Sequence, residues 1–164
     1  MTKMTQMKSI ANMTKHTSNE LLLLPLSVGS QKTSAMVDSG ATHNCISNNM
    51  LDIIKSTSHG CVKWWHASEP LRVSLADNSV VLSTKIVVLS VQIGEHVQQD
   101  IEFHVVPRLN HPLILGLQWL RIANPTIDWS MLNITLDGHT APVVTSTIDN
   151  RSKHSATLCT AKQM

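Results

Sequence analysis

Apolar and polar positions alternate through much of the chain between residues 21 and 136. Residues 21–28 and 31–37 are two apolar runs separated by a Gly-Ser pair, a pattern typical of two strands joined by a tight turn. Residues 80–93 form a longer run rich in β-branched side chains, which also favours a strand. Three shorter alternating runs predict further strands, at 71–75, 101–105 and 132–136.

Two short segments between these runs have helical character instead. Residues 46–54 can form a short helix, and residues 117–122 can form one or two helical turns that end at Asn124-Pro125. Many short strands at regular spacing, with so little helix, predict an all-β, barrel-like fold.

The length of 164 residues fits one domain with tails. Residues 1–19 are polar and have no sustained period, so we expect a flexible leader. The domain is expected at 20–138, where the last alternating strand closes at Asp137-Gly138. Residues 139–164 are rich in Thr and Ser, and we expect a disordered tail there.

Composition and charge narrow the class of partner. The hydrophobic content of 42% is ample for a core, and with one Phe and no Tyr aliphatic side chains must fill most of it. The net charge of +2, without a run of basic residues, points to no nucleic-acid and no membrane partner. No signal peptide is evident, and three cysteines without paired spacing favour a reduced, intracellular setting.

The most informative segment is residues 35–47, in which a short apolar run ends at the carboxylate of Asp38. An ionised carboxylate at the rim of a core is costly unless it is paired, hydrogen-bonded or protonated. Ser39 can donate a hydrogen bond, and Gly40 allows a close approach of the backbone. The segment therefore predicts a site built for one aspartate.

Asp38-Ser-Gly-Ala-Thr, followed by Asn44-Cys-Ile-Ser, resembles the active-site signature of retropepsin-like aspartic proteases, in the form found in gypsy-type LTR retrotransposons and their domesticated relatives. A second block at 112–120, with Asn-Pro-Thr-Ile-Asp-Trp at 124–129, agrees with this family. Gln118 departs from it, because an aspartate is common there. The resemblance spans about residues 21–138 and implies an all-β, retropepsin-like acid protease barrel with one short C-terminal helix.

The resemblance implies catalysis by two carboxylates that share one proton. Asp-Ser-Gly occurs once in this chain, so the second carboxylate must come from another copy. We therefore expect a homodimer with Asp38 of each subunit on the two-fold axis. One Asp38 would take a proton from water while its protonated twin donates to the substrate carbonyl.

The resemblance also assigns roles to three loops. The active-site loop would contain Ser39, Gly40, Ala41 and Thr42, with Ser39 bonding across the dimer axis. Ile114, Leu115 and Gly116 would support it from behind. A flap over an extended polypeptide substrate is expected at Ala76, Asp77, Asn78 and Ser79, where asparagine replaces a usual glycine because it tolerates positive φ.

These roles give an aspartic endopeptidase without metal or cofactor. Its partners would be a second copy of the chain and an extended polypeptide, most simply a Gag-Pol polyprotein. Its location would be the cytoplasm, including virus-like particles. Two other functions stay open: a catalytically silent dimerisation or peptide-binding module, and a retropepsin-like domain of the ubiquitin-shuttle type.

Other readings of single residues are weaker. Asp38 could be an ordinary turn aspartate, and His43 with Cys45 could suggest a cysteine protease, although no orienting group accompanies them. His59, Cys61 and His66 do not match a zinc spacing. We expect Asp128 to be structural and Trp64-Trp65 to lie in the core or on the dimer surface.

Overall fold

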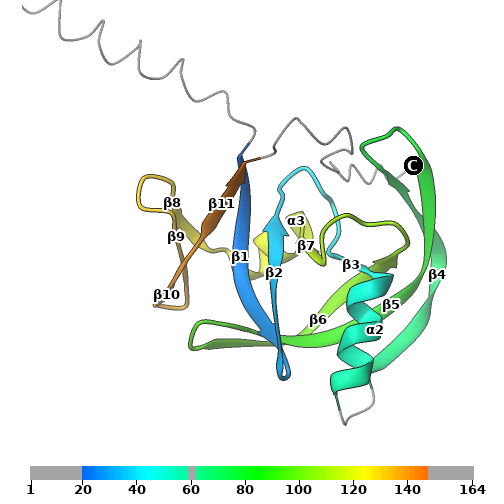
Figure 1. Ribbon diagram of the computed structural model, residues 1–164, viewed down its shortest axis with the longest axis horizontal. Helices are drawn as coiled ribbons and strands as arrows, with labels where there is room; N and C mark the ends of the chain where they lie inside the picture. Colours follow the sequence, from blue (N-terminus) through cyan, green and yellow to red (C-terminus); the bar gives the residue numbers. More distant parts are fainter. Residues whose placement is uncertain (1–19, 59–61, 148–164) are drawn as a thin grey trace, which may run out of the picture.

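The computed structural model describes residues 20–58 and 62–147 (Figure 1). The expected flexible leader at 1–19, the histidine and cysteine at 59–61, and the end of the expected tail at 148–164 lie outside the described residues. The strands are β1 (Glu20–Val28), β2 (Gln31–Val37), β3 (Cys45–Ser47), β4 (Lys63–Ser74), β5 (Val80–Ile93), β6 (His96–Val106), β7 (Leu113–Leu115), β8 (Thr126–Asp128), β9 (Asn133–Leu136), β10 (His139–Pro142) and β11 (Val144–Thr147). The helices are α2 (Asn48–Thr57) and α3 (Leu117–Ala123).

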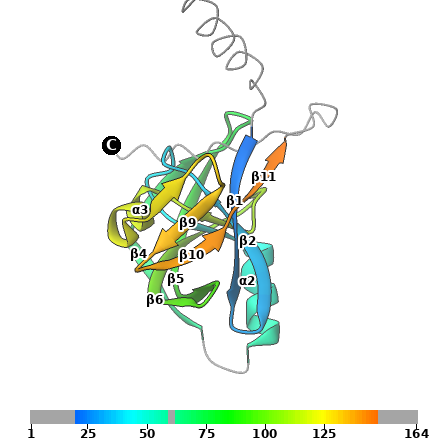
Figure 2. The same cartoon turned by 90° about the vertical axis from the view of Figure 1, so that its left-hand side faces the viewer.

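The strands form one large curved sheet and one small sheet. The eight strands of the large sheet follow the order β11-β1-β2-β7-β3-β6-β5-β4, and Ser27 of β1 also pairs with Gln92 of β5. This extra pairing closes the curved sheet on itself, as a barrel requires. The small sheet, β10-β9-β8, lies beside β1 and β11 (Figures 1 and 2). The predicted all-β, barrel-like fold is confirmed.

Two groups of buried side chains fill the interior. The larger one joins alternate residues of β5, such as Val87, Leu89 and Val91, to Phe103 of β6 and to one face of α2. The smaller one lies between the β4–β5 hairpin and the loop after β2. We call the smaller one the loop cluster; it contains Met36, Ala41, Cys45, Leu71, Val73, Leu75, Val81, Val106, Leu109 and Ile114.

The described residues contain two helices, where the fold-class prediction named one short C-terminal helix. Helix α3 occupies the predicted position and ends at Asn124, whose φ of 42° turns the chain. Helix α2 begins later than predicted, because Cys45–Ser47 extend into strand β3 between β6 and β7. The Ser47 hydroxyl caps α2 by accepting a hydrogen bond from the Met50 N–H at 3.1 Å.

The expected disordered tail is wrong for residues 139–147, which form β10 and β11. Asp137 and Gly138, with φ of 46° and 80°, are the two-residue turn of a hairpin in which His139 pairs with Leu136. Strand β11 then pairs with the first residues of β1. The ordered domain therefore extends past the predicted boundary at residue 138.

None of the helices in the described residues is long and apolar enough to span a membrane.

Candidate active site

Asp38 follows directly after β2, at the end of the barrel that also carries the tip of the β4–β5 hairpin (Figure 1). Its backbone N–H donates to the Leu115 carbonyl at 3.0 Å, which ties the residue to β7. Its Oδ1 accepts a hydrogen bond from the Gly40 N–H at 2.8 Å. Among the described residues, Oδ2 is shielded from solvent and has no hydrogen-bond partner. Buried acceptors rarely lack a hydrogen-bond partner, so Oδ2 is free to accept a hydrogen bond from a further group.

The loops after β2 and β7 cross at Gly116, where their two backbones lie in close contact. A Cβ on Gly116 would lie 2.5 Å from the His43 carbonyl oxygen and 2.6 Å from that of Ala41. The Leu117 N–H donates to the Ala41 carbonyl at 2.7 Å, and the Gln118 N–H donates to the Thr42 carbonyl at 3.2 Å. Only glycine fits at this crossing.

The structure brings the expected active-site loop and supporting loop together. Ile114 and Leu115 pair in parallel with Met36 and Val37, the two residues before Asp38. Both supporting side chains are fully buried. Ser39 and Gly40 are exposed at the turn, whereas Ala41 is buried in the loop cluster. The carboxylate is thus held at the rim of a rigid apolar core.

Asn44 is a site residue that the sequence reasoning did not assign, although it lies within the signature. It is 2% exposed. Its Oδ1 accepts a hydrogen bond from the Gly116 N–H at 3.0 Å, and its Nδ2 donates to the Glu102 carbonyl at 3.2 Å. The amide therefore ties the loop crossing to β6.

The expected flap residues, 76–79, form the turn of the β4–β5 hairpin. Asn78 has a φ of 62°, so it adopts the left-handed conformation expected of it. Oδ1 of Asp77 accepts hydrogen bonds from the hydroxyl and the N–H of Ser79. These bonds, with the charge of Arg108, hold the pKa of Asp77 below its ordinary value.

The base of this hairpin is anchored to the active-site loop through shared apolar contacts. Leu75 and Val81, on either side of the turn, belong to the loop cluster with Ala41 and Ile114. The hairpin tip and the loop that carries Asp38 therefore lie at the same end of the molecule in both orientations (Figures 1 and 2). This placement is the one a flap needs.

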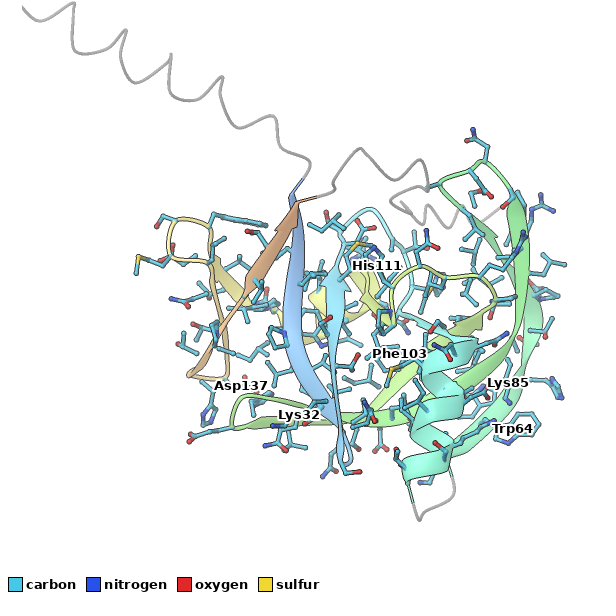
Figure 3. All side chains as sticks on the ribbon, viewed as in Figure 1. Lys32, Trp64, Lys85, Phe103, His111 and Asp137 are labelled. Atoms are coloured by element: carbon cyan, nitrogen blue, oxygen red, sulfur yellow. The ribbon has the colours of Figure 1, made fainter. Side chains whose placement is uncertain are left out.

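His111 is a second residue near the site that no sequence pattern identified. It lies in the loop between β6 and β7 at the same end of the molecule (Figure 3). Burial lowers the pKa of His111, and the nearby charge of Asp38 acts in the opposite direction. His111 is therefore close enough to sense the charge of Asp38.

The geometry gives no support to a cysteine protease. Cys45 is 2% exposed and belongs to the loop cluster, and its Sγ lies 3.8 Å from the His43 carbonyl oxygen. The ring nitrogen Nδ1 of His43 lies instead 2.8 Å from the Thr42 hydroxyl, and the ring packs edge-on against His104. Burial and then the neighbouring His43 lower the pKa of His104 to about 4.

Two other expectations concern metal ligands and Asp128. Within residues 20–58 and 62–147, no three histidine, cysteine or acidic side chains are grouped so that they could hold a metal ion. Oδ1 of Asp128 accepts hydrogen bonds from the Met131 N–H at 2.9 Å and from the N–H and hydroxyl of Ser130. Asp128 thus organises the β8–β9 turn, as a structural residue would.

Comparison with known proteins agrees with this geometry. The model of the PEG10/RTL1 protease domain matches residues 34–143, which is more than half of the chain. The chain belongs to this family. The resemblance to a retropepsin-like protease of retrotransposon type is confirmed, and the match extends through β10, past the boundary that the sequence predicted.

The fold of this PEG10/RTL1-type domain is also similar to solved retropepsin-like structures. The retroviral protease-like domain of Ddi1 from Leishmania major has a TM-score of 0.56 at 16% sequence identity, covering 76% of this chain and 94% of that one. A retropepsin-like aspartic protease from Rickettsia conorii has a TM-score of 0.44 at 21% identity, covering 67% and 85%. The likeness to the Ddi1 domain supports the retropepsin-like fold and nothing finer.

Proposed function

We propose that this domain is an aspartic endopeptidase that acts as a homodimer, with one Asp38 from each subunit. The observation that carries the proposal is the state of the Asp38 carboxylate. Its Oδ1 is fixed by Gly40, while Oδ2 is buried and has no partner among the described residues. A second carboxyl group or a bound water at Oδ2 would satisfy this acceptor.

The single Asp-Ser-Gly in the sequence requires a second copy of the chain for this chemistry. Two carboxylates in contact cannot both ionise at low cost, so the pair would hold one proton. A two-fold axis through the site would supply the second carboxylate from the same residue. Ser39, exposed beside the axis, would link the two loops by hydrogen bonding.

The reaction then follows from the shared proton. The ionised Asp38 removes a proton from the bound water, and the water oxygen attacks the carbonyl carbon of the scissile bond. The protonated Asp38 donates its proton to the carbonyl oxygen as the tetrahedral intermediate forms. The proton taken from water passes to the leaving nitrogen as the C–N bond breaks. The other Asp38 takes back a hydroxyl proton of the intermediate as the carbonyl re-forms, so the pair again holds one proton.

The β4–β5 hairpins would cover an extended polypeptide that lies across the two Asp38 residues. Apolar pocket walls would favour hydrophobic side chains near the scissile bond, and the buried loop cluster beneath each hairpin would support these walls. A polyprotein that carries this domain is the simplest substrate, and the cytoplasm, with virus-like particles assembled there, is the proposed location.

Cleavage of a proteome-derived peptide library, read by mass spectrometry, tests the proposal. The unmodified protein should cleave, a pepstatin-type inhibitor should block it, and Asp38→Asn should abolish it without loss of folding. Asp137→Asn is the matched control, since that carboxylate lies in an exposed turn with its side chain 83% exposed. Cleavage that survives in Asp38→Asn would refute aspartic catalysis.

A mixing experiment tests the shared site separately. When unmodified and Asp38→Asn chains are refolded together in equal amounts, random pairing leaves about one quarter of the dimers with two intact carboxylates. Activity per intact chain should therefore fall to about one half. Activity that stays proportional to intact chains alone would mean that each subunit works by itself.

A stable dimer that cleaves nothing would favour the silent dimerisation or peptide-binding module, and cleavage confined to ubiquitin-bearing substrates would favour the ubiquitin-shuttle type.

A further inference from the structure

Strand β4 is an outer strand of the large sheet and, within residues 20–58 and 62–147, pairs on one side only, with β5. Its first four residues, Lys63–His66, are all exposed. The regular pairing is interrupted between His66 and Leu71, which separates this segment from the flap half of the hairpin. An unpaired strand edge presents backbone N–H and C=O groups that another strand can bind.

A tryptophan stands on each face of this edge. Trp64 and Trp65 are 48% and 41% exposed, which excludes the core position, one of the two that were expected for this pair. Neighbouring strand residues point to opposite faces, and Trp64 shares its face with His66, whose ring meets it edge-on at 5.3 Å. Trp65 lies on the other face opposite Ile86. A strand added here would bury apolar surface on both faces at once.

The charges around the edge are mainly positive. The Lys85 ammonium lies 4.4 Å from the centre of the Trp64 ring, and Lys63 is exposed next to it in sequence. Lys55 and Asp52 of α2 also interact with Lys85. Lys55 and Lys85 thus lie with one carboxylate, Asp52, on the face of Trp64, while Lys63 lies on the face of Trp65. Two copies of this edge would bring like charges together, which disfavours self-pairing.

Figure 3 shows Trp64 and Lys85 beside each other at the outer edge of the molecule, on a different side from His111. The edge is thus separate from the end that carries Asp38 and the flap. A strand bound there would leave the candidate active site open.

We propose that residues Lys63–His66 form a peptide-binding edge that adds an extended acidic segment as a further strand of the sheet. The segment would carry at least two consecutive apolar residues, one beside each tryptophan, flanked by Asp or Glu. Backbone hydrogen bonds to β4 would hold it, the tryptophans would select its apolar residues and the lysines its acidic ones. This site does not depend on the proposed catalysis.

Fluorescence anisotropy with a labelled Glu-Asp-Val-Phe-Val-Asp-Glu peptide tests this site. The protein is the full chain carrying Asp38→Asn, so that cleavage cannot change the probe. Trp64→Ala or Trp65→Ala should weaken binding about tenfold or more, as for a central aromatic contact. Trp129→Ala is the matched control, because Trp129 is 68% exposed on the β8–β9 turn, and it should change affinity less than about twofold.

Two further variants separate binding from folding and from charge. Lys63→Glu alters an exposed side chain, so the fold should remain and affinity should fall about fivefold, with a weaker dependence on salt. The same peptide with N-methylated Val and Phe amides should not bind, because it cannot form the backbone bonds.

Several results would overturn the proposal. Equal binding of the methylated peptide would exclude strand addition, and displacement of the peptide by a pepstatin-type inhibitor would place it at the active site. Competition by single-stranded oligothymidine would indicate a nucleic-acid platform instead. A change in sedimentation for Trp64→Ala would show that a second copy of the chain occupies the edge.

Discussion

The side chain of Asn44 and the backbone of Gly116 are joined by a hydrogen bond of 3.0 Å between buried groups. The Nδ2 of the same amide donates a hydrogen bond to the Glu102 carbonyl. Two loops that are far apart in sequence and one strand thus depend on a single side chain.

We expect Asn44→Ala to reduce the free energy of unfolding by about 2–3 kcal/mol, because it leaves the Gly116 N–H and the Glu102 carbonyl without partners. Chemical denaturation measures this change. Asn48→Ala, at an exposed position of α2, should cost less than about 0.5 kcal/mol. Equal effects of the two substitutions would show that the Asn44 amide does not hold the crossing.

Gly116→Ala should prevent stable folding, since its Cβ would overlap two backbone carbonyl oxygens that cannot move independently. A loss of at least about 3 kcal/mol is expected. Gly40→Ala is the informative contrast, because its Cβ would lie 3.1 Å from the side-chain Oδ1 of Asp38 and within 4 Å of no main-chain atom beyond its chain neighbours. That variant should remain folded but lose cleavage activity. Thermal unfolding and the peptide-library assay distinguish the two results.

Asn78 should be replaceable by glycine but not by alanine. Its φ of 62° costs an ordinary residue about 1 kcal/mol, whereas glycine adopts it without strain. Asn78→Ala should therefore raise the rate of amide hydrogen exchange at the hairpin turn, and Asn78→Gly should leave stability within about 0.5 kcal/mol. If the hairpin is the flap, Asn78→Gly should change KM more than it changes the unfolding temperature.

His104 should make the fold sensitive to acid. Burial holds its pKa near 4, below the ordinary value of 6.5, so the unfolded chain binds more protons between these pH values. Stability is therefore fully present above pH 6.5 and is lost as the pH falls toward 4. After allowance for partial exposure of the ring, the loss is about 1–2 kcal/mol. His104→Gln should flatten the pH dependence of urea unfolding over this range, and an unchanged slope would contradict this origin.

Val143, which precedes β11, and Val144, the first residue of β11, test whether residues past 138 belong to the domain. Val143 is 6% exposed and lies in the larger core, whereas Val144 is 53% exposed. Val143→Ala should cost about 1–2 kcal/mol and Val144→Ala less than about 0.5 kcal/mol. Equal and negligible effects would favour the tail that the composition suggested.

The sequence revealed the strands whose alternation is long or whose turns are strong. Residues 80–93 and the Gly29 turn were predicted where the structure places them. A strand that is buried on one face has apolar residues at every second position, and this alternation is visible in the sequence. The prediction of a disordered tail failed at residues 139–147 for a local reason. Asp137-Gly138 was interpreted as an end, although the same pair is a strong hairpin signal, and short strands rich in Thr resemble loops in composition.

The residues of the candidate site also differ in whether the sequence identifies them. Asp38 was identifiable because its neighbours in sequence form the turn that holds it, so a contiguous motif records the site. The role of Asn44 and the position of His111 depend on contacts with residues far along the chain. No local pattern encodes such contacts, and a single sequence therefore could not single out these two residues.

The parallel pairing of Val37 with Leu115 has a consequence for the order of events during synthesis. The two residues are 78 positions apart, so a long loop must close before the turn at Asp38 is held in place. A chain emerging from the ribosome would lack a formed site until β7 and the Gly116 crossing have left the exit tunnel. An incomplete chain would therefore lack the held turn at Asp38 that the proposed cleavage requires.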